Sequence, residues 1–372
     1  MNVESLYVHY PFCRHLCNYC DFHKAVKNSE KEKAFEKVLL GQILNNKKLL
    51  SEEGHSLSRL KTLYIGGGTP SLWGAAGLKS FIDSLKDSGT LIDPEAEFTL
   101  ELNPGSWNDG EISKFIDLGV NRFSVGVQSL NPEILKRLDR VHSISDVYKT
   151  LKVLNDLKVN FSIDFMLGLP GSLDRSISDE LDEVFSFGPS HISSYILTVG
   201  KGYIHYSELP SEERVSKEYL NFVEYLKKYR IYQYEVSNFS KKGFESKHNL
   251  QYWRSESVAA LGPSATGLLV KNNEALRYKW KVGDSSNEFT REKLDSKTLH
   301  FERLYLALRI ARNLNLKEFF SEDVCEKLPD ICNSWKSNGF CMSSDPKSLT
   351  LTPKGFLFVD SLLSDLFPFL KN

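Results

Sequence analysis

The sequence predicts an α/β protein built as a partial (β/α)6 TIM-like barrel with a small helix-rich C-terminal domain. Short apolar runs rich in β-branched and aromatic residues alternate with segments of helical period as far as about residue 205. This alternation predicts parallel strands joined by helices. Glycines and polar residues recur where these runs end, as expected at the mouth of such a barrel.

Six runs are predicted to be strands, and the segments between them carry helix-start signals. Ser29 with Glu32 predicts a capping box before an amphipathic helix that ends near Leu50. Asn131 followed by Pro132 is typical of another helix start. The predicted strands are residues 6–10, 62–65, 98–102, 122–127, 161–165 and 192–199.

After about residue 205 the alternation becomes irregular. We expect a helix over 212–229, a short strand over 231–236, and a linker over the polar and charged residues 271–298. Residues 348–358 suggest a small β-ribbon before a final amphipathic helix. Three parts are therefore expected: a barrel core (1–205), a barrel extension with the linker (206–298), and a small helical, winged-helix-like domain (299–372).

Charge and hydropathy give no case for a nucleic-acid or membrane partner. The chain has 47 basic and 48 acidic residues, a net charge of -1, and no long block of one sign. No stretch reaches the roughly 18 apolar residues of a membrane-spanning helix, and the first ten residues do not read as a signal peptide. We therefore expect a cytoplasmic protein that does not bind nucleic acid.

Three of the six cysteines are packed into one short loop after the first predicted strand. Cys13, Cys17 and Cys20 have the spacing CxxxCxxC, and such clustered thiolates favour an iron–sulfur cluster or zinc. Zinc is the weaker alternative, because structural zinc usually has four ligands from paired knuckles. Three ligands on a 4Fe-4S cube leave one iron open, and that iron could chelate the amino and carboxylate groups of S-adenosylmethionine.

A simpler alternative is that these are three ordinary cysteines. Free cysteines are usually buried, however, and these share a polar loop with Arg14, Asn18 and Asp21. The cluster interpretation is therefore preferred.

Polar groups and glycines follow several of the other predicted strands. Missing Cβ atoms in the GGGTP segment after residue 65 let the backbone approach a ligand, although a plain tight turn would look the same. No Lys-Ser/Thr pair follows, so nucleoside triphosphate binding is disfavoured. Each polar residue has a simple structural alternative, as a solvated group, a helix cap or an ion-pair partner of Asp139, but the mouth of one barrel would bring them all together. They are Gly67, Gly68, Thr69, Glu101, Gln128, Arg140 and Asp164.

Several longer motifs carry a resemblance to a known family. They are HYPFCRHLCNYCDF, GGGTPSLW, LELNPGS, RFSVGVQSL, DFMLGLP and YEVSNF, between about Leu6 and Gly267, with a weaker match at LTPKGFLF. The chain resembles the oxygen-independent coproporphyrinogen III oxidase-like family of radical S-adenosylmethionine proteins. The resemblance implies that the seven residues named above contact S-adenosylmethionine, with Tyr7 and Tyr19 near the cluster.

The family has two branches, and the sequence is more similar to the HemW type. The oxidase branch carries a fourth cysteine where Phe22 stands, and a long N-terminal extension where only 12 residues precede Cys13. The HemW-type motif HNxxYW matches residues 248–253 and implies heme handling. Within it, a neutral His248 could ligate heme iron and aromatic rings could pack on the porphyrin, or His248 could be a structural histidine. The candidate heme residues are His248, Asn249, Tyr252 and Trp253.

The resemblance implies a heme chaperone that delivers heme to respiratory-chain hemoproteins. An oxygen-independent coproporphyrinogen III oxidase, or another radical enzyme acting on a tetrapyrrole, is the alternative, and a degenerate scaffold without a cluster is a third. Cleavage of S-adenosylmethionine, the electron donor, homodimerisation and peripheral membrane contact are left open. Four positions depart from the family pattern and put details of the substrate pocket in doubt, namely Asp139, Gly200, Tyr203 and Thr266.

Overall fold

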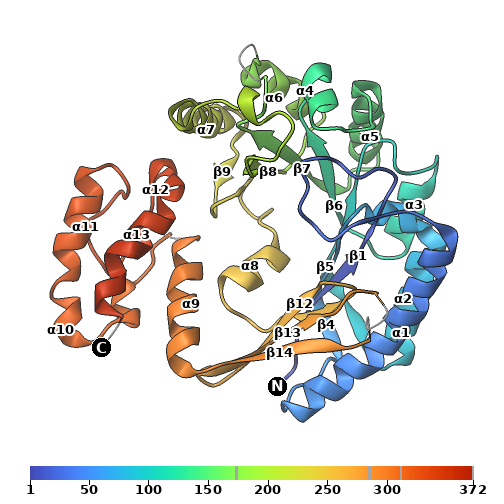
Figure 1. Ribbon diagram of the computed structural model, residues 1–372, viewed down its shortest axis with the longest axis horizontal. Coiled ribbons are helices and arrows are strands. Elements are labelled where there is room, and N and C mark those ends of the chain that lie inside the picture. The colour runs from blue at the N-terminus through green and yellow to red at the C-terminus, as the bar shows by residue number, and fades with distance from the viewer. Residues whose placement is uncertain (172–174, 284–286, 311, 371–372) are drawn as a thin grey trace.

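A mostly parallel sheet forms the centre of the protein (Figure 1). The computed structural model describes residues 1–171, 175–283, 287–310 and 312–370. In this part of the chain the central sheet has nine strands in the order β11-β1-β4-β5-β6-β7-β8-β10-β9. Strands β11 to β8 run parallel, and β10 and β9 are added antiparallel at one edge. The strands are β1 (Ser5–Tyr10), β4 (Arg59–Gly67), β5 (Leu91–Leu102), β6 (Arg122–Gln128), β7 (Asn160–Leu167), β8 (His191–Ile196), β9 (Tyr232–Gln233), β10 (Asn238–Ser240) and β11 (Ala259–Leu261).

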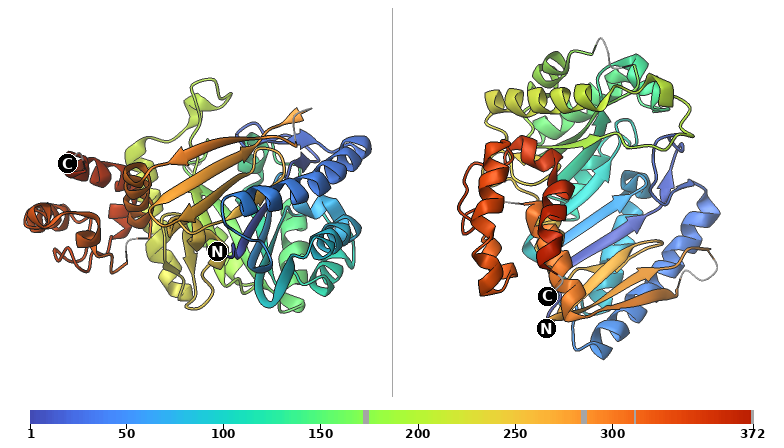
Figure 2. Two further views of the ribbon diagram at one scale, coloured as in Figure 1. Left: turned by 90° about the horizontal axis from the view of Figure 1, so that it is seen from below. Right: turned by 60° about the vertical axis from the view of Figure 1, so that its left-hand side comes forward.

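Helices between the strands cover the outer face of this sheet, which completes six β/α units (Figures 1 and 2). All six predicted strands are present as β1, β4, β5, β6, β7 and β8. Asn131 caps α4 as predicted, with its side chain accepting hydrogen bonds from the backbone N–H groups of Glu133 and Ile134. The helices are α1 (Ser29–Glu52), α2 (Gly74–Asp87), α3 (Glu111–Asp117), α4 (Pro132–Arg137), α5 (Ile144–Asp156), α6 (Ile177–Phe185) and α7 (Glu212–Leu226).

The two faces of the parallel sheet differ in chemistry. Side chains alternate along each strand, so one set points to the helices and the other to the inside of the sheet. The outward set, for example Leu63, Phe98 and Phe123, belongs to the large hydrophobic core. The inward set includes Tyr64 and Glu101, which hydrogen-bond to each other. The inner face is therefore polar and free to carry a site.

In the part of the chain that the structure describes, the sheet curves and is open between its two edges (Figure 2), and the predicted α/β fold class is confirmed. Within the described residues, no strand pairing joins β9 to β11. Helix α8 (Lys247–Trp253) instead packs against β4 on the inner side of the sheet (Figure 1). The His248 ring lies 2.8 Å from Oγ1 of Thr62, measured from Nδ1.

Three local predictions are wrong. Asn28 rather than Ser29 caps α1, because its side chain accepts the N–H groups of Glu30 and Lys31, while Glu32 binds Lys27 and Tyr10 instead. The expected linker at 271–298 contains β13 (Glu274–Trp280) and β14 (Phe289–Leu294), which form a small sheet with β12 (Thr266–Lys271). The expected ribbon at 348–358 holds only single bridges before a helix begins at Pro353.

The C-terminal region is rich in helices, as predicted, and has a hydrophobic core of its own (Figures 1 and 2). Trp335 is fully buried in this core and donates from Nε1 to Oδ2 of Asp365 over 2.8 Å. The backbone N–H of Val236 donates to the carbonyl of Arg309, which ties the region to the segment beside β9. The three-part division of the chain stays a prediction. The helices here are α9 (Ser296–Leu308), α10 (Glu322–Cys325), α11 (Leu328–Ser337), α12 (Pro353–Leu357) and α13 (Val359–Leu366).

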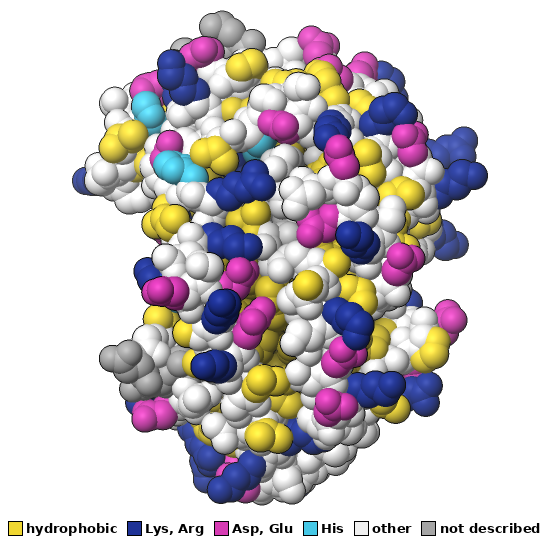
Figure 3. Space-filling model, turned by 90° about the vertical axis from the view of Figure 1, so that its right-hand side faces the viewer, with side chains coloured by type: hydrophobic (Ala, Val, Ile, Leu, Met, Phe, Trp, Pro, Cys, Tyr) yellow, Lys and Arg dark blue, Asp and Glu magenta, His cyan; other side chains and the backbone are white. Residues whose placement is uncertain are grey.

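The surface carries mixed charges. Figure 3 shows basic and acidic side chains interspersed over one face of the molecule, as the near-zero net charge suggests. In the part of the chain that the structure describes, none of the helices has the length and apolar character needed to span a membrane.

Candidate cluster and cofactor site

The cysteine loop is anchored by two short strands that pair in parallel, β2 (Phe12–Cys13) and β3 (Ala25–Val26). Between them, Lys24 folds back and donates from Nζ to the backbone carbonyls of Cys17, at 3.0 Å, and Cys20. Strand pairing therefore fixes both ends of the loop, and the Lys24 ammonium holds two of its backbone carbonyls close together.

The three thiols of this loop line one cavity of about 210 Å³. Burial raises the pKa of Cys13, and the Thr69 hydroxyl and the Lys24 ammonium act in the opposite direction. Among the described residues, no three His, Cys, Asp or Glu side chains are placed to hold a single metal ion. Each cysteine of a 4Fe-4S cube binds a different iron, and three thiols around one cavity fit that donor set.

The glycine loop lies directly against the start of the cysteine loop. The N–H groups of Gly68 and Thr69 donate to the carbonyls of Tyr10 and Phe12, at 2.7 and 2.9 Å. A Cβ on Gly68 would lie 2.7 Å from the Phe12 carbonyl oxygen, so a side chain there would separate the two loops. The glycines thus have a packing role, and they also line the cavity that holds the thiols.

Two carboxylates, from the strands on either side of β6, face an adjoining cavity of about 390 Å³. Glu101 accepts hydrogen bonds from Oη of Tyr64, at 2.8 Å, and from the N–H of Gly67, at 3.0 Å. Burial, and then the nearby charge of Asp164, raises the pKa of Glu101 to about 7. Burial raises the pKa of Asp164 to about 6, against a stabilising hydrogen bond from Ser124. A cationic group entering this cavity would stabilise both carboxylates in their charged form.

Arg140 and Gln128 complete this cavity. Arg140 donates from Nη2 to Oδ1 of Asn103 and to the carbonyl of Gly126, each at 2.7 Å, and does not pair with Asp139. Asp139 instead pairs with His15. Gln128 is not a helix cap, and its side chain lines the cavity. The guanidinium of Arg140 offers an anion a partner in the same cavity as the two carboxylates.

The two predicted tyrosines lie at different depths. Tyr19 lines both cavities beside Cys20. Tyr7 lies deeper in the sheet, where its Oη is 3.0 Å from Nδ1 of His9, and burial raises its pKa well above 10. Tyr19 is therefore placed to touch a ligand, whereas Tyr7 lines neither cavity.

The HNxxYW motif forms α8, and its histidine faces inward. His248 is 1% exposed and stacks on the Tyr64 ring at 5.2 Å between centroids. Burial, and then the positive charge of Arg122, lowers the pKa of His248 to about 3, so the ring is neutral. Nε2 of His248 and Nε1 of Trp253 are buried without a hydrogen-bond partner in the described part of the chain. Direct ligation of heme iron by His248 stays a prediction, and it requires α8 to shift.

The other motif residues are more accessible. Asn249, Tyr252 and Trp253 are half-buried. The carboxylate of Glu97 accepts the backbone N–H groups of Lys247 and His248, at 2.9 and 2.8 Å, and so anchors the start of α8. In this motif His248 is therefore buried against the sheet, while Asn249, Tyr252 and Trp253 are partly accessible.

Further residues of the pocket were not among the candidates from the sequence. Asn103, Ser124 and Tyr195 line the second cavity with Glu101 and Asp164. Asn103 directly follows a predicted strand, and Ser124 lies an even number of positions before Gln128 on another, so strand periodicity could have identified both. Four positions depart from the family pattern. Asp139 pairs with His15, and the Tyr203 hydroxyl donates to the Arg137 carbonyl. Gly200 has open space at its Cβ position, and Thr266 lies in β12.

Comparison with known proteins places the chain in a family. The radical SAM superfamily model matches residues 7–184. Heme chaperone HemW of Lactococcus lactis is 30% identical, covering 98% of both chains, and that of Bacillus subtilis is 33% identical, covering 72% of this chain and 71% of the relative. Coproporphyrinogen III oxidase (HemN) from Escherichia coli, a radical SAM enzyme, has a TM-score of 0.81 over 97% of this chain and 89% of that chain.

These comparisons differ in what they show. The likeness to the Escherichia coli structure is at 19% identity and shows the fold alone. The superfamily implies a 4Fe-4S cluster and S-adenosylmethionine, which agrees with the three thiols and the charged cavity described above. The chain belongs to the radical SAM superfamily and, within it, to the family of proteins named heme chaperone HemW.

Proposed function

We propose that the protein binds a 4Fe-4S cluster through Cys13, Cys17 and Cys20, binds S-adenosylmethionine beside it, and acts as a heme-binding chaperone for respiratory hemoproteins. The observation that carries the first part is the meeting of three thiols, two carboxylates and one arginine at the ends of parallel strands. The names of the relatives support the second part.

The residues of the pocket suit the parts of S-adenosylmethionine. The Arg140 guanidinium would hold the carboxylate, while Glu101 and Asp164 would face its positive charges. Gln128 offers an amide donor and acceptor, and Gly67, Gly68 and Thr69 form the wall towards the cluster. When bound, the cluster and S-adenosylmethionine supply one-electron chemistry, and the residues of this chain bind and orient them.

Heme is proposed to bind along the half-buried side of α8. Asn249, Tyr252 and Trp253 provide aromatic surface and polar groups there. His248 would support this site indirectly, because its contacts with Thr62 and Tyr64 fix α8 on the sheet. No residue is assigned as the axial ligand.

The test begins with anaerobic reconstitution with iron and sulfide, followed by titrations with S-adenosylmethionine and heme and an assay with coproporphyrinogen III. We expect one cluster, saturable S-adenosylmethionine binding, stoichiometric heme uptake and no conversion of the porphyrinogen. Steady conversion would instead make the protein an oxygen-independent coproporphyrinogen III oxidase.

A pair of aromatic variants locates the heme site. Tyr252→Ala with Trp253→Ala should weaken heme binding at unchanged iron content. The matched control is Tyr148→Ala with Trp107→Ala, two half-buried aromatic residues away from α8, on α5 and in the loop after β5. Equal loss of heme in both pairs would refute the α8 site.

A further inference from the structure

The end of β6 contains a strained turn beside the pocket. Gln128 has a positive φ of 68°, which non-glycine residues rarely adopt. The N–H of Ser129 donates to the carbonyl of Val127 over 2.9 Å, a bond that spans only two residues and closes a γ-turn around Gln128. The strand register with β7 also shifts between Gly126 and Gln128. Such backbone persists only when the surrounding structure holds it.

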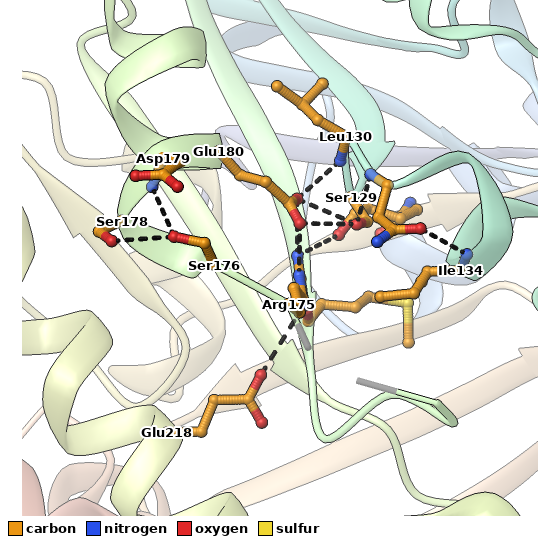
Figure 4. A network of polar contacts seen from close by, with 12 residues as sticks. Ser129, Leu130, Ile134, Arg175, Ser176, Ser178, Asp179, Glu180 and Glu218 are labelled. Carbon is orange, nitrogen blue, oxygen red and sulfur yellow. Dashed lines mark hydrogen bonds and ion pairs between the residues drawn. The ribbon is translucent and has the colours of Figure 1, made fainter. Parts of the chain in front are cut away.

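Arg175 hydrogen-bonds to this turn and lies beside Ser129 and Glu180 (Figure 4). Its guanidinium donates to two backbone carbonyls, that of Met166 from Nη1 at 2.6 Å and that of Gln128 from Nη2 at 3.4 Å. The same group stacks on the Phe165 ring, 4.5 Å from its centroid. Arg175 therefore joins the ends of β6 and β7, the two strands that carry Gln128 and Asp164.

Glu180 accepts hydrogen bonds from the two residues that follow Gln128. Its carboxylate accepts the Leu130 N–H at 2.6 Å and the Ser129 hydroxyl at 3.0 Å. It also binds Nε and Nη2 of Arg175, at 2.7 and 3.0 Å, in a two-pronged ion pair (Figure 4). Gln128 is thus held on its own carbonyl and on the next two residues.

This ion pair is removed from water. The side chains of Arg175 and Glu180 are 1% and 9% exposed. Burying two charges costs several kcal/mol, so a buried ion pair adds little stability compared with an apolar pair of similar volume. The ion pair instead fixes geometry, because the guanidinium of Arg175 hydrogen-bonds to Glu180 and to the ends of β6 and β7 at the same time.

We propose that Arg175 and Glu180 are positioning residues that keep Gln128 turned into the S-adenosylmethionine pocket and so set the affinity for that ligand. Neither residue lines the two cavities of the site, so both act through the backbone around Gln128. The inference rests on the proposed function, specifically on contact between Gln128 and S-adenosylmethionine.

The test compares S-adenosylmethionine affinity in reconstituted protein. Arg175→Met with Glu180→Met removes the two charges of this ion pair together. Glu218, whose carboxylate lies 3.9 Å from Nη1 of Arg175, keeps its hydrogen bond from the Gly168 N–H, so the protein is expected to fold and keep its cluster. The Kd for S-adenosylmethionine should rise about tenfold, the scale of losing one good hydrogen bond to the ligand. The perturbation of the reduced cluster's electron paramagnetic resonance spectrum by the ligand should need correspondingly more ligand. Arg277→Met with Glu292→Met, a partly exposed pair on β13 and β14, is the matched control and should leave the Kd unchanged.

A double-mutant cycle separates positioning from general damage. In a Gln128→Ala background, the Arg175→Met/Glu180→Met change should add little further loss, because its effect passes through Gln128. Fully additive losses, or an unchanged Kd in the Arg175→Met/Glu180→Met protein, would overturn the positioning role alone. An unchanged Kd in Gln128→Ala by itself would refute the proposed contact with S-adenosylmethionine, and the inference with it.

Discussion

Among single residues, Cys20 gives the most direct test of the cluster. We expect Cys20→Ser to lose most of the iron and sulfide bound by the reconstituted protein, because a hydroxyl is a poor ligand for iron–sulfur clusters. The thiol is half-exposed, so the melting temperature of the cluster-free protein should hardly change. Iron and sulfide analysis with thermal melting measures both quantities. Cys325→Ser, at another free and half-exposed cysteine, should keep a full cluster.

Glu101 should make the stability of the cofactor-free protein depend on pH. Its pKa rises from an ordinary 4.5 to about 7 in the folded chain, so the unfolded chain loses this proton first as the pH rises. The folded state is therefore penalised progressively between these two pKa values, by about 1 to 3 kcal/mol in total. Glu101→Gln cannot ionise and should gain that much relative to the unchanged protein between pH 4.5 and about pH 8.

Denaturant unfolding at pH 4.5 and about pH 8 measures the unfolding free energies of Glu101→Gln and of the unchanged protein. Glu213→Gln, at an exposed carboxylate, should show the same pH dependence as the unchanged protein. A Glu101→Gln advantage that is equal at both pH values would mean that folding does not raise the pKa of Glu101.

Among the elements, α8 depends on a carboxylate from another part of the chain. Glu97→Ala leaves the N–H groups of Lys247 and His248 buried without an acceptor, and should cost about 2 to 4 kcal/mol of unfolding free energy. The amides of α8 should then exchange with solvent faster than those of α2. Hydrogen-exchange mass spectrometry reports both helices. Glu95→Ala, at an exposed glutamate two positions earlier, should change neither.

The elements also show which features a sequence reveals. The six parallel strands were predictable because each is a compact apolar run. Strand β14 was missed because it pairs only with β13 and exposes most of its side chains, so it reads as a polar linker. The helix at Pro353 did carry a local signal, since Thr352 caps it, but the apolar residues before it suggested a ribbon.

The pocket was predictable only where its residues end strands. Glu101 and Asp164 could be placed because parallel strands bring their ends together. The contacts of Arg175 could not, because its partners Gln128 and Glu180 lie 47 and 5 positions away along the chain and meet only after folding. The inward turn of His248 was equally hidden, since a seven-residue helix gives too short a pattern to show which side is buried.

For the molecule as a whole, the two hydrophobic cores predict two levels of stability. Trp335→Ala would open a cavity in the C-terminal core and should cost that region about 3 to 5 kcal/mol. We expect faster amide exchange across α11 and α13 while iron content and exchange in β4 to β7 stay unchanged. If exchange rose equally in both regions, the chain would unfold as one unit and the proposed C-terminal domain would be refuted.

The cysteine loop lies at the surface of the molecule. Residues 14–16, 18 and 21–22 are exposed, and none of the three thiols belongs to the hydrophobic cores. We therefore expect iron and sulfide to enter and leave the loop while both hydrophobic cores stay folded. Repair of an oxidised cluster would then depend on the supply of iron and sulfide and not on the synthesis of a new chain.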